Sequence, residues 1–143
     1  FLVAAHQYND DVTQPQLDSQ IQSIKKTGIN PFEIEIGNLN SFASAPFLEI
    51  HDPDRGIPRL REALSHGAQE FRTAPYRAHL TIGLYASAFP SKEVAERIAA
   101  FSKEPIRWTV KQVTLAAYKA NEYAGRLTYL TNLKLRQNHQ PKE

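Results

Sequence analysis

The order of predicted elements occurs twice in this chain of 143 residues, and that duplication limits the folds open to it. Each copy reads as a strand, a polar loop, a helix, a strand that follows a proline, a turn and a last strand. The copies span residues 1–50 and 79–135, and the run 31–34 (PFEI) recurs at 105–108 (PIRW). A duplicated unit predicts two lobes related by a pseudo-twofold axis, each an antiparallel sheet with covering helices. The cleft between two such lobes is a natural place for a ligand.

Apolar residues at helical spacing predict three helices. The first runs from Pro15, which suits a first turn, to a stop at Gly28. The second covers residues 58–71, and the third begins at Ser91 as its cap. Their expected inner faces are Leu17, Ile21 and Ile24 in the first, Leu60, Ala63, Leu64 and Ala68 in the second, and Val94, Ile98 and Phe101 in the third.

Six strands are predicted from apolar runs and from the alternation of apolar with polar residues. They cover residues 1–5, 31–37, 46–50, 79–85, 106–118 and 126–135, with turn-like residues at 38–44. The side chains expected in the core are Phe32, Ile34, Ile36, Leu80, Ile82, Leu84, Trp108, Val110 and Val113. This mixture of elements makes the fold class α+β, and the length suits a single domain over residues 1–143.

The composition narrows the chemistry that the chain can perform. It contains no cysteine, so disulfides, thiolate nucleophiles and cysteine-bound metals are excluded. The net charge of +2 permits an anionic ligand but is low for a protein that binds duplexes through a basic stripe. No apolar run approaches the ~20 residues of a membrane span, and no signal peptide is visible. We therefore expect a cytoplasmic protein that does not enter a membrane.

Residues 75–85 (PYRAHLTIGLY) form a predicted strand that carries His79 and Thr81. Because side chains alternate along a strand, these two residues share one face, and Leu80 and Ile82 point to the other. An imidazole and a hydroxyl on one exposed face can move a proton and stabilise an oxyanion. The alternative is a half-buried strand with an incidental histidine, since H-x-T is a short and common pattern.

The chain resembles the two-histidine (2H) phosphoesterases, whose bacterial members are often named 2'-5' RNA ligases. The resemblance rests on the duplicated order and on residues 31–37 (PFEIEIG), 41–42 (SF), 45–50 (APFLEI) and 76–85 (YRAHLTIGLY). It covers nearly the whole chain. It implies a duplicated bilobal 2H-phosphoesterase-like fold, with two antiparallel sheets around a central cleft and helices outside.

The resemblance also implies a mechanism. Two H-x-T motifs, one from each lobe, face each other across the cleft, and no metal or cofactor is needed. One histidine acts as general base and the other as general acid on a 2',3'-cyclic phosphate, while the hydroxyls hold the phosphate oxygens. His79 would then be one acid or base and Thr81 a phosphate ligand. The implied partner is RNA or a nucleotide that ends in a cyclic phosphate, and we expect a monomer.

This chain departs from the family pattern because it contains one H-x-T motif, not two. None of His6, His51, His66 and His139 has Thr or Ser two places on. The repeat offset places the counterpart of His79 at residue 5, beside His6. Three interpretations stay open: the first motif precedes Phe1, it has degenerated to residues 1–3 (FLV), or His6 with Tyr8 replaces it. We favour the first, because the chain begins inside a predicted strand.

Other residues have both an ordinary and a functional interpretation. Arg77 can contact phosphate or base, but a surface role is the simpler explanation. His51 with Asp52 and Asp54 is typical of turn chemistry, so we expect no metal there. Aromatic and basic side chains that can line a cleft for base stacking are Tyr118, Lys119 and Tyr123.

Two rival functions are compatible with these patterns. The first is a non-catalytic nucleotide- or RNA-binding module that kept the cleft and lost one histidine. The second is an unrelated α+β domain that packs a partner on its sheets. The acid or base role of His79, substrate size, base preference and oligomeric state leave no trace in the residues. Hydrolysis and ligation use the same groups, so they are not separated either.

Overall fold

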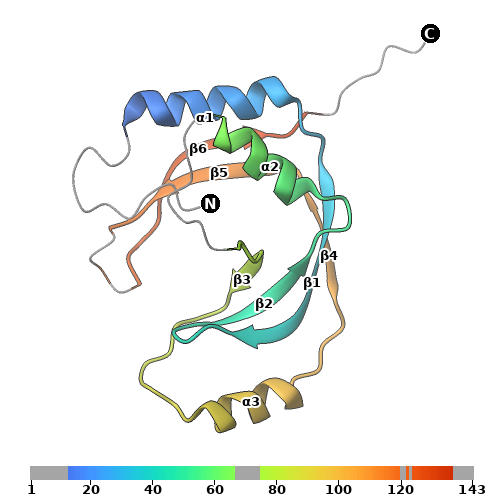
Figure 1. Cartoon of the computed structure of the whole chain (residues 1–143), viewed down its shortest axis with the longest axis vertical. Helices are drawn as coiled ribbons and strands as arrows, with labels where there is room; N and C mark the ends of the chain where they lie inside the picture. Colours follow the sequence, from blue (N-terminus) through green and yellow to red (C-terminus); the bar gives the residue numbers. More distant parts are fainter. Residues whose placement is uncertain (1–12, 67–74, 120–121, 123, 137–143) are drawn as a thin grey trace. The chain divides into compact units, whose positions relative to one another are not determined.

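A computed structural model describes residues 13–66, 75–119, 122 and 124–136 (Figure 1). Its elements in chain order are α1 (Gln14–Thr27), β1 (Phe32–Ser41), β2 (Pro46–His51), α2 (Gly56–Ser65), β3 (His79–Thr81), α3 (Ser91–Ala100), β4 (Ile106–Val110), β5 (Gln112–Ala117) and β6 (Thr128–Lys134). This mixture of helices and antiparallel strands confirms the α+β class. The predicted strand at residues 1–5 lies outside the described residues. No helix in the described part is long and apolar enough to cross a membrane.

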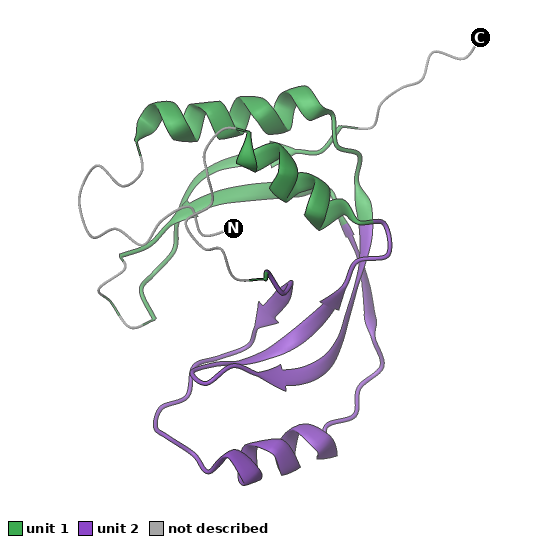
Figure 2. Cartoon of the chain, viewed as in Figure 1, with its two compact units in different colours: residues 1–32, 55–75, 110–143 green, residues 33–54, 76–109 purple. Residues whose placement is uncertain are grey.

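The chain divides into two compact units, each built from segments of both sequence repeats (Figure 2). One unit takes residues 1–32, 55–75 and 110–143, and includes α1, α2, β5 and β6. The other takes residues 33–54 and 76–109, and includes β2, β3, α3 and nearly all of β1 and β4. A single repeat therefore does not make one compact unit by itself.

Helix α1 begins and ends where the sequence predicts. The backbone N–H of Thr13, its N-cap, donates a hydrogen bond to the Gln16 side chain at 2.8 Å, and Pro15 lies in the first turn. Gly28 ends the helix in the left-handed conformation, with φ of 60°. Because this conformation is strained for residues with a Cβ, a glycine is favoured there.

Helix α2 packs against α1 in the same unit. Leu60 and Ala63 on its inner face are buried, as predicted, while Leu64 is half-buried and Ala68 lies outside the described residues. At its first residue, Gly56, an added Cβ would overlap the ring of Phe32. The close approach of helix and ring is thus possible only without a side chain at that position.

A four-stranded sheet with the order β3-β2-β1-β4 forms the core of the other unit. Strands β1 and β2 are antiparallel, and a bulge between Ile36 and Leu39 interrupts their register. Strand β1 extends to Ser41 and so includes residues predicted as a turn. Phe32 and Ile34 are buried as predicted, and Ile36 is half-buried. Strand β3 lies at the edge, antiparallel to β2.

The single strand predicted at 106–118 is wrong, because the chain forms two strands that join different sheets. The break falls at Lys111, whose carbonyl accepts a hydrogen bond from the N–H of Leu135 at 2.9 Å. Strand β4 pairs in the four-stranded sheet, whereas β5 pairs with β6 in a two-stranded antiparallel sheet. Trp108 on β4 is 61% exposed and does not belong to the core. Val110 and Val113 are half-buried.

The predicted strand at 79–85 is also shorter than expected, and its apolar side is not a closed core. Leu80, Ile82 and Leu84 are between 42% and 53% exposed. Two features explain this exposure. Strand β3 is an edge strand, and α3 buries none of its residues. A cavity of about 400 Å³ remains between α3 and the sheet, lined by Leu39, Pro46, Tyr85, Phe89, Glu93, Val94, Arg97 and Ile98.

Candidate active site

His79 and Thr81 lie at the two ends of the edge strand β3 and share one face of the sheet. In the register of β2 and β3, Glu49 is directly opposite His79 and Phe47 is opposite Thr81. His79 is half-buried and Thr81 is exposed. The alternation predicted from the sequence therefore places both side chains together, next to residues of β2 that the sequence analysis did not single out as functional.

Two phenylalanine rings support the imidazole of His79. Phe42 and Phe47 are stacked with 4.1 Å between ring centroids. The imidazole stands edge-on to both rings, at 4.9 Å from Phe42 and 5.5 Å from Phe47. Edge-to-face contacts of this kind are favourable and directional. Because Phe47 is fully buried, the histidine rests on the core of the unit and not on a mobile surface group.

A hydrogen bond to the backbone selects the tautomer of the His79 imidazole. The Nδ1 atom of His79 lies 2.7 Å from the carbonyl oxygen of Arg77. A carbonyl oxygen only accepts, so Nδ1 is the donor and carries the proton. The Nε2 atom then holds a lone pair in the neutral ring and a proton in the imidazolium. Nε2 is therefore the atom available for proton transfer to or from a substrate.

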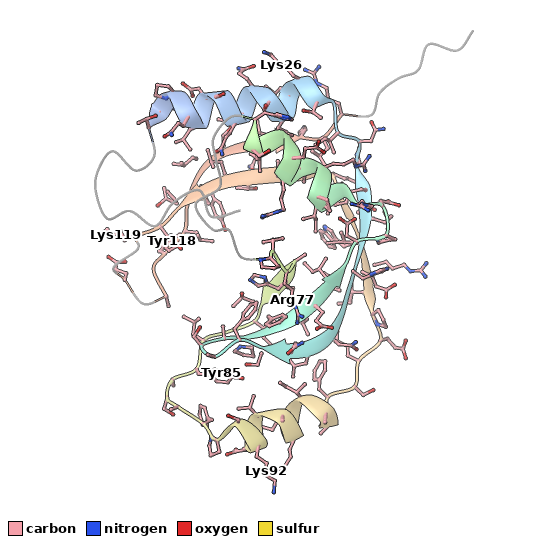
Figure 3. The ribbon with its side chains drawn as sticks, viewed as in Figure 1. Lys26, Arg77, Tyr85, Lys92, Tyr118 and Lys119 are labelled. Atoms are coloured by element: carbon pink, nitrogen blue, oxygen red, sulfur yellow. The ribbon has the colours of Figure 1, made fainter. Side chains whose placement is uncertain are left out.

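A row of polar side chains continues from His79 across the same face. The Nη1 atom of Arg77 forms an ion pair with Oε1 of Glu49 at 3.5 Å, and Nδ2 of Asn40 donates to the same oxygen at 2.6 Å. Figure 3 shows Arg77 beside strands β2 and β3. Arg77 was a candidate from its sequence position alone. Glu49 and Asn40 were missed, because only the strand registers bring Glu49 opposite His79 and Asn40 opposite Phe47.

A cavity of about 320 Å³ adjoins this row. Its lining residues are Glu35, Gly37, Asn38, Glu49, Ile50, His51, Arg77, Ala78 and Pro105. His51 is exposed and lies on β2 two residues from Glu49, and hence on the same face. The cavity therefore presents both hydrogen-bond donors and acceptors next to the H-x-T strand.

The acidic residues after β2 behave as turn residues. A side-chain oxygen of Asp54, Oδ2, accepts a hydrogen bond from the N–H of Glu33 at 3.0 Å. In the part of the chain that the structure describes, no three His, Asp or Glu side chains gather as metal ligands do. The site is thus built from imidazole, hydroxyl, guanidinium and carboxylate groups.

Other candidates lie elsewhere or beyond the described residues. Tyr118 is exposed, and Lys119 forms an ion pair with Glu122 at 3.0 Å in the unit that does not contain His79 (Figure 3). Tyr123, His6 and residues 1–3 lie outside the described residues, so the position of a second histidine stays a prediction. Tyr85 lines the cavity under α3, and its hydroxyl lies 2.8 Å from that of Ser41, consistent with a packing role.

The comparison with known families covers most of the chain. Residues 3–122 match the model of the 2'-5' RNA ligase superfamily. This span includes the H-x-T strand, its aromatic support and the residues of the adjoining cavity. No curated protein and no solved structure matches the chain. The motif in β3 and the extent of the match thus agree, and the chain belongs to the 2'-5' RNA ligase superfamily.

Proposed function

We propose that this protein is a metal-independent phosphodiesterase that opens the 2',3'-cyclic phosphate of RNA ends or small nucleotides. Membership in the superfamily supports a phosphoesterase or ligase-type reaction on RNA. The observation that carries the proposal is the bond from Nδ1 of His79 to the Arg77 carbonyl, which leaves Nε2 for the substrate. Thr81 lies two residues further on the same face, where its hydroxyl can donate to a phosphate oxygen.

The reaction needs two proton transfers. A general base takes a proton from water as the water oxygen forms a bond to phosphorus. The bond from phosphorus to O2' or O3' breaks, and a general acid gives a proton to that leaving oxygen. The product is a phosphomonoester, and His79 supplies one of the two transfers. Thr81 stabilises the charge that develops on a non-bridging oxygen.

A non-catalytic nucleotide- or RNA-binding module is the second candidate. The observation that favours it is that His79 is the only histidine of this sequence in an H-x-T motif. Such a module would retain the phosphate contacts of Thr81 and lack one of the two proton transfers. The family match argues against the unrelated α+β domain, because it extends over residues 3–122.

The decisive experiment uses the full-length gene product. The protein is incubated with EDTA and an RNA oligonucleotide that ends in a 2',3'-cyclic phosphate. Conversion to a single phosphomonoester isomer is expected from the wild type and from His66→Ala, a control at the exposed end of α2. It is lost in His79→Ala, provided that this variant still melts cooperatively. No conversion by the wild type favours the non-catalytic binding module instead. Equal conversion by His79→Ala would show that His79 does not catalyse the reaction.

A further inference from the structure

Arg77 carries a positive charge on the same face of the sheet as His79. The proposed acid–base chemistry does not use this charge. We infer that Arg77 binds the phosphodiester next to the reactive cyclic phosphate. The preferred substrate is then the end of an RNA chain and not a single nucleotide. This inference rests on the proposed function, and it adds a residue that determines substrate length.

Arg77 lies two residues before β3 (His79–Thr81), and this spacing separates it from the reactive phosphate. Side chains two residues apart on a strand are about 6.5 to 7 Å apart. Thr81 and Arg77 lie on opposite sides of His79 along the chain. A phosphate held between His79 and Thr81 is therefore displaced from Arg77 by more than one such step. That separation suits a neighbouring phosphate of the same chain better than a third ligand on the reacting one.

The ion pair with Glu49 does not engage all the N–H donors of the Arg77 guanidinium. Arginine carries five N–H donors in a planar fork that matches phosphate oxygens. Arg77 forms an ion pair with Oε1 of Glu49 that is long at 3.5 Å, and its side chain is 59% exposed. An exposed ion pair of this kind contributes little to stability, so a phosphate can replace the carboxylate at low cost.

Glu49 keeps the guanidinium in place when no substrate is bound. The hydrogen bond from Asn40, at 2.6 Å, anchors the Glu49 carboxylate from the side of β1. The anchored carboxylate then holds Arg77 over β2, beside the cavity of about 320 Å³ that both residues line. A cavity of this volume is at the lower end of small-molecule sites and can take one nucleotide.

The rival explanation is a purely structural ion pair that fixes the start of β3. The two explanations differ in the role of Glu49. If the pair is structural, removing either partner should raise KM by the same factor. If Arg77 binds substrate, Glu49 competes with the phosphate, so its removal favours binding while removal of Arg77 opposes it. Opposite signs for the two substitutions are therefore the signature of a substrate contact.

The test compares two substrates that differ by one phosphodiester. One is a nucleoside 2',3'-cyclic monophosphate and the other a dinucleotide with the same cyclic end. Arg77→Gln is expected to raise KM for the dinucleotide about tenfold to hundredfold, because charge-assisted hydrogen bonds are lost. KM for the mononucleotide should not change. Glu49→Gln is expected to lower KM for the dinucleotide about two- to fivefold. Lys92→Gln, which removes an exposed cation on α3 of the same unit, should change neither.

Two kinetic outcomes would overturn the inference. Equal losses on both substrates would show that Arg77 serves the reactive phosphate or the strand. Equal losses from Arg77→Gln and Glu49→Gln would show a structural pair. If the wild type converts neither substrate, the proposed function fails, and the inference is then decided by binding of a dinucleotide 3'-phosphate. Weaker binding by Arg77→Gln than by wild type would support it, and equal binding would refute it.

Discussion

The imidazole of His79 stands edge-on to the ring of Phe47, with 5.5 Å between the two centroids. Phe47 is fully buried, and it lies opposite Thr81 on the neighbouring strand. One core side chain therefore contacts the histidine and stands opposite the threonine of the H-x-T pair. Stability and site geometry are linked through this ring.

Phe47→Ala is expected to lower the free energy of unfolding by about 3 to 5 kcal/mol, because it removes a buried aromatic ring and leaves a cavity. Phe42→Ala should cost clearly less, since Phe42 is 39% exposed. Urea denaturation followed by far-UV circular dichroism measures both values. A loss from Phe42→Ala as large as that from Phe47→Ala would contradict the assignment of Phe47 as the core member of the pair.

Thr81→Val removes a hydroxyl and keeps the shape of the side chain. Because Thr81 is exposed, the free energy of unfolding should change by no more than about 0.5 kcal/mol. The value of kcat for the cyclic phosphate should fall about tenfold to a hundredfold, because a donor to the developing charge is lost. Thr81→Ser restores the hydroxyl and should recover most of the activity. Full activity in Thr81→Val would remove Thr81 from the phosphate site.

Gly56→Ala is expected to destabilise the protein by about 1 to 3 kcal/mol, because the new methyl group overlaps the ring of Phe32. The matched control is Gly37→Ala on β1, where an added Cβ meets no atom within 4 Å. Thermal and urea denaturation of the two variants measure the difference. Equal stability of both variants would show that Phe32 moves aside without cost.

Gln20→Met is expected to stabilise the protein by about 1 to 3 kcal/mol. Gln20 on α1 is 2% exposed, and among the described residues neither its Oε1 nor its Nε2 has a hydrogen-bond partner. Burying such a polar group without a partner carries the full free-energy penalty of desolvation. An apolar side chain of similar shape avoids this penalty. Gln22→Met at an exposed position of the same helix is the control. A lower melting temperature for Gln20→Met would show that the amide has a partner in solution.

Local patterns predicted several elements well. Helix α1 has Pro15 in its first turn and ends at Gly28, and β2 begins at Pro46, as the residues indicate. Each of these features depends on contacts within a few residues, such as a capping bond or a left-handed glycine. The same holds for His79 and Thr81, because strand alternation alone places them on one face.

Pairing between distant segments decided the strand boundaries and the burial that local patterns did not predict. The break at Lys111 follows from the choice of partner strand, since β4 joins one sheet and β5 the other. Apolarity predicted a buried Trp108, but burial depends on what covers the residue, and this side chain is largely exposed. On α3, Val94 and Ile98 of the predicted inner face line the cavity beside the sheet but are only half-buried, and Phe101 is 40% exposed.

The sequence by itself determined helix α1, the family pattern and the H-x-T pair, because these depend on neighbouring residues. Only the tertiary structure decided what surrounds that pair. The register of β2 with β3 brings Phe47 and Glu49 to His79. Hydrogen bonds and ring contacts between separate strands form only when the backbone aligns them, so no local pattern encodes them.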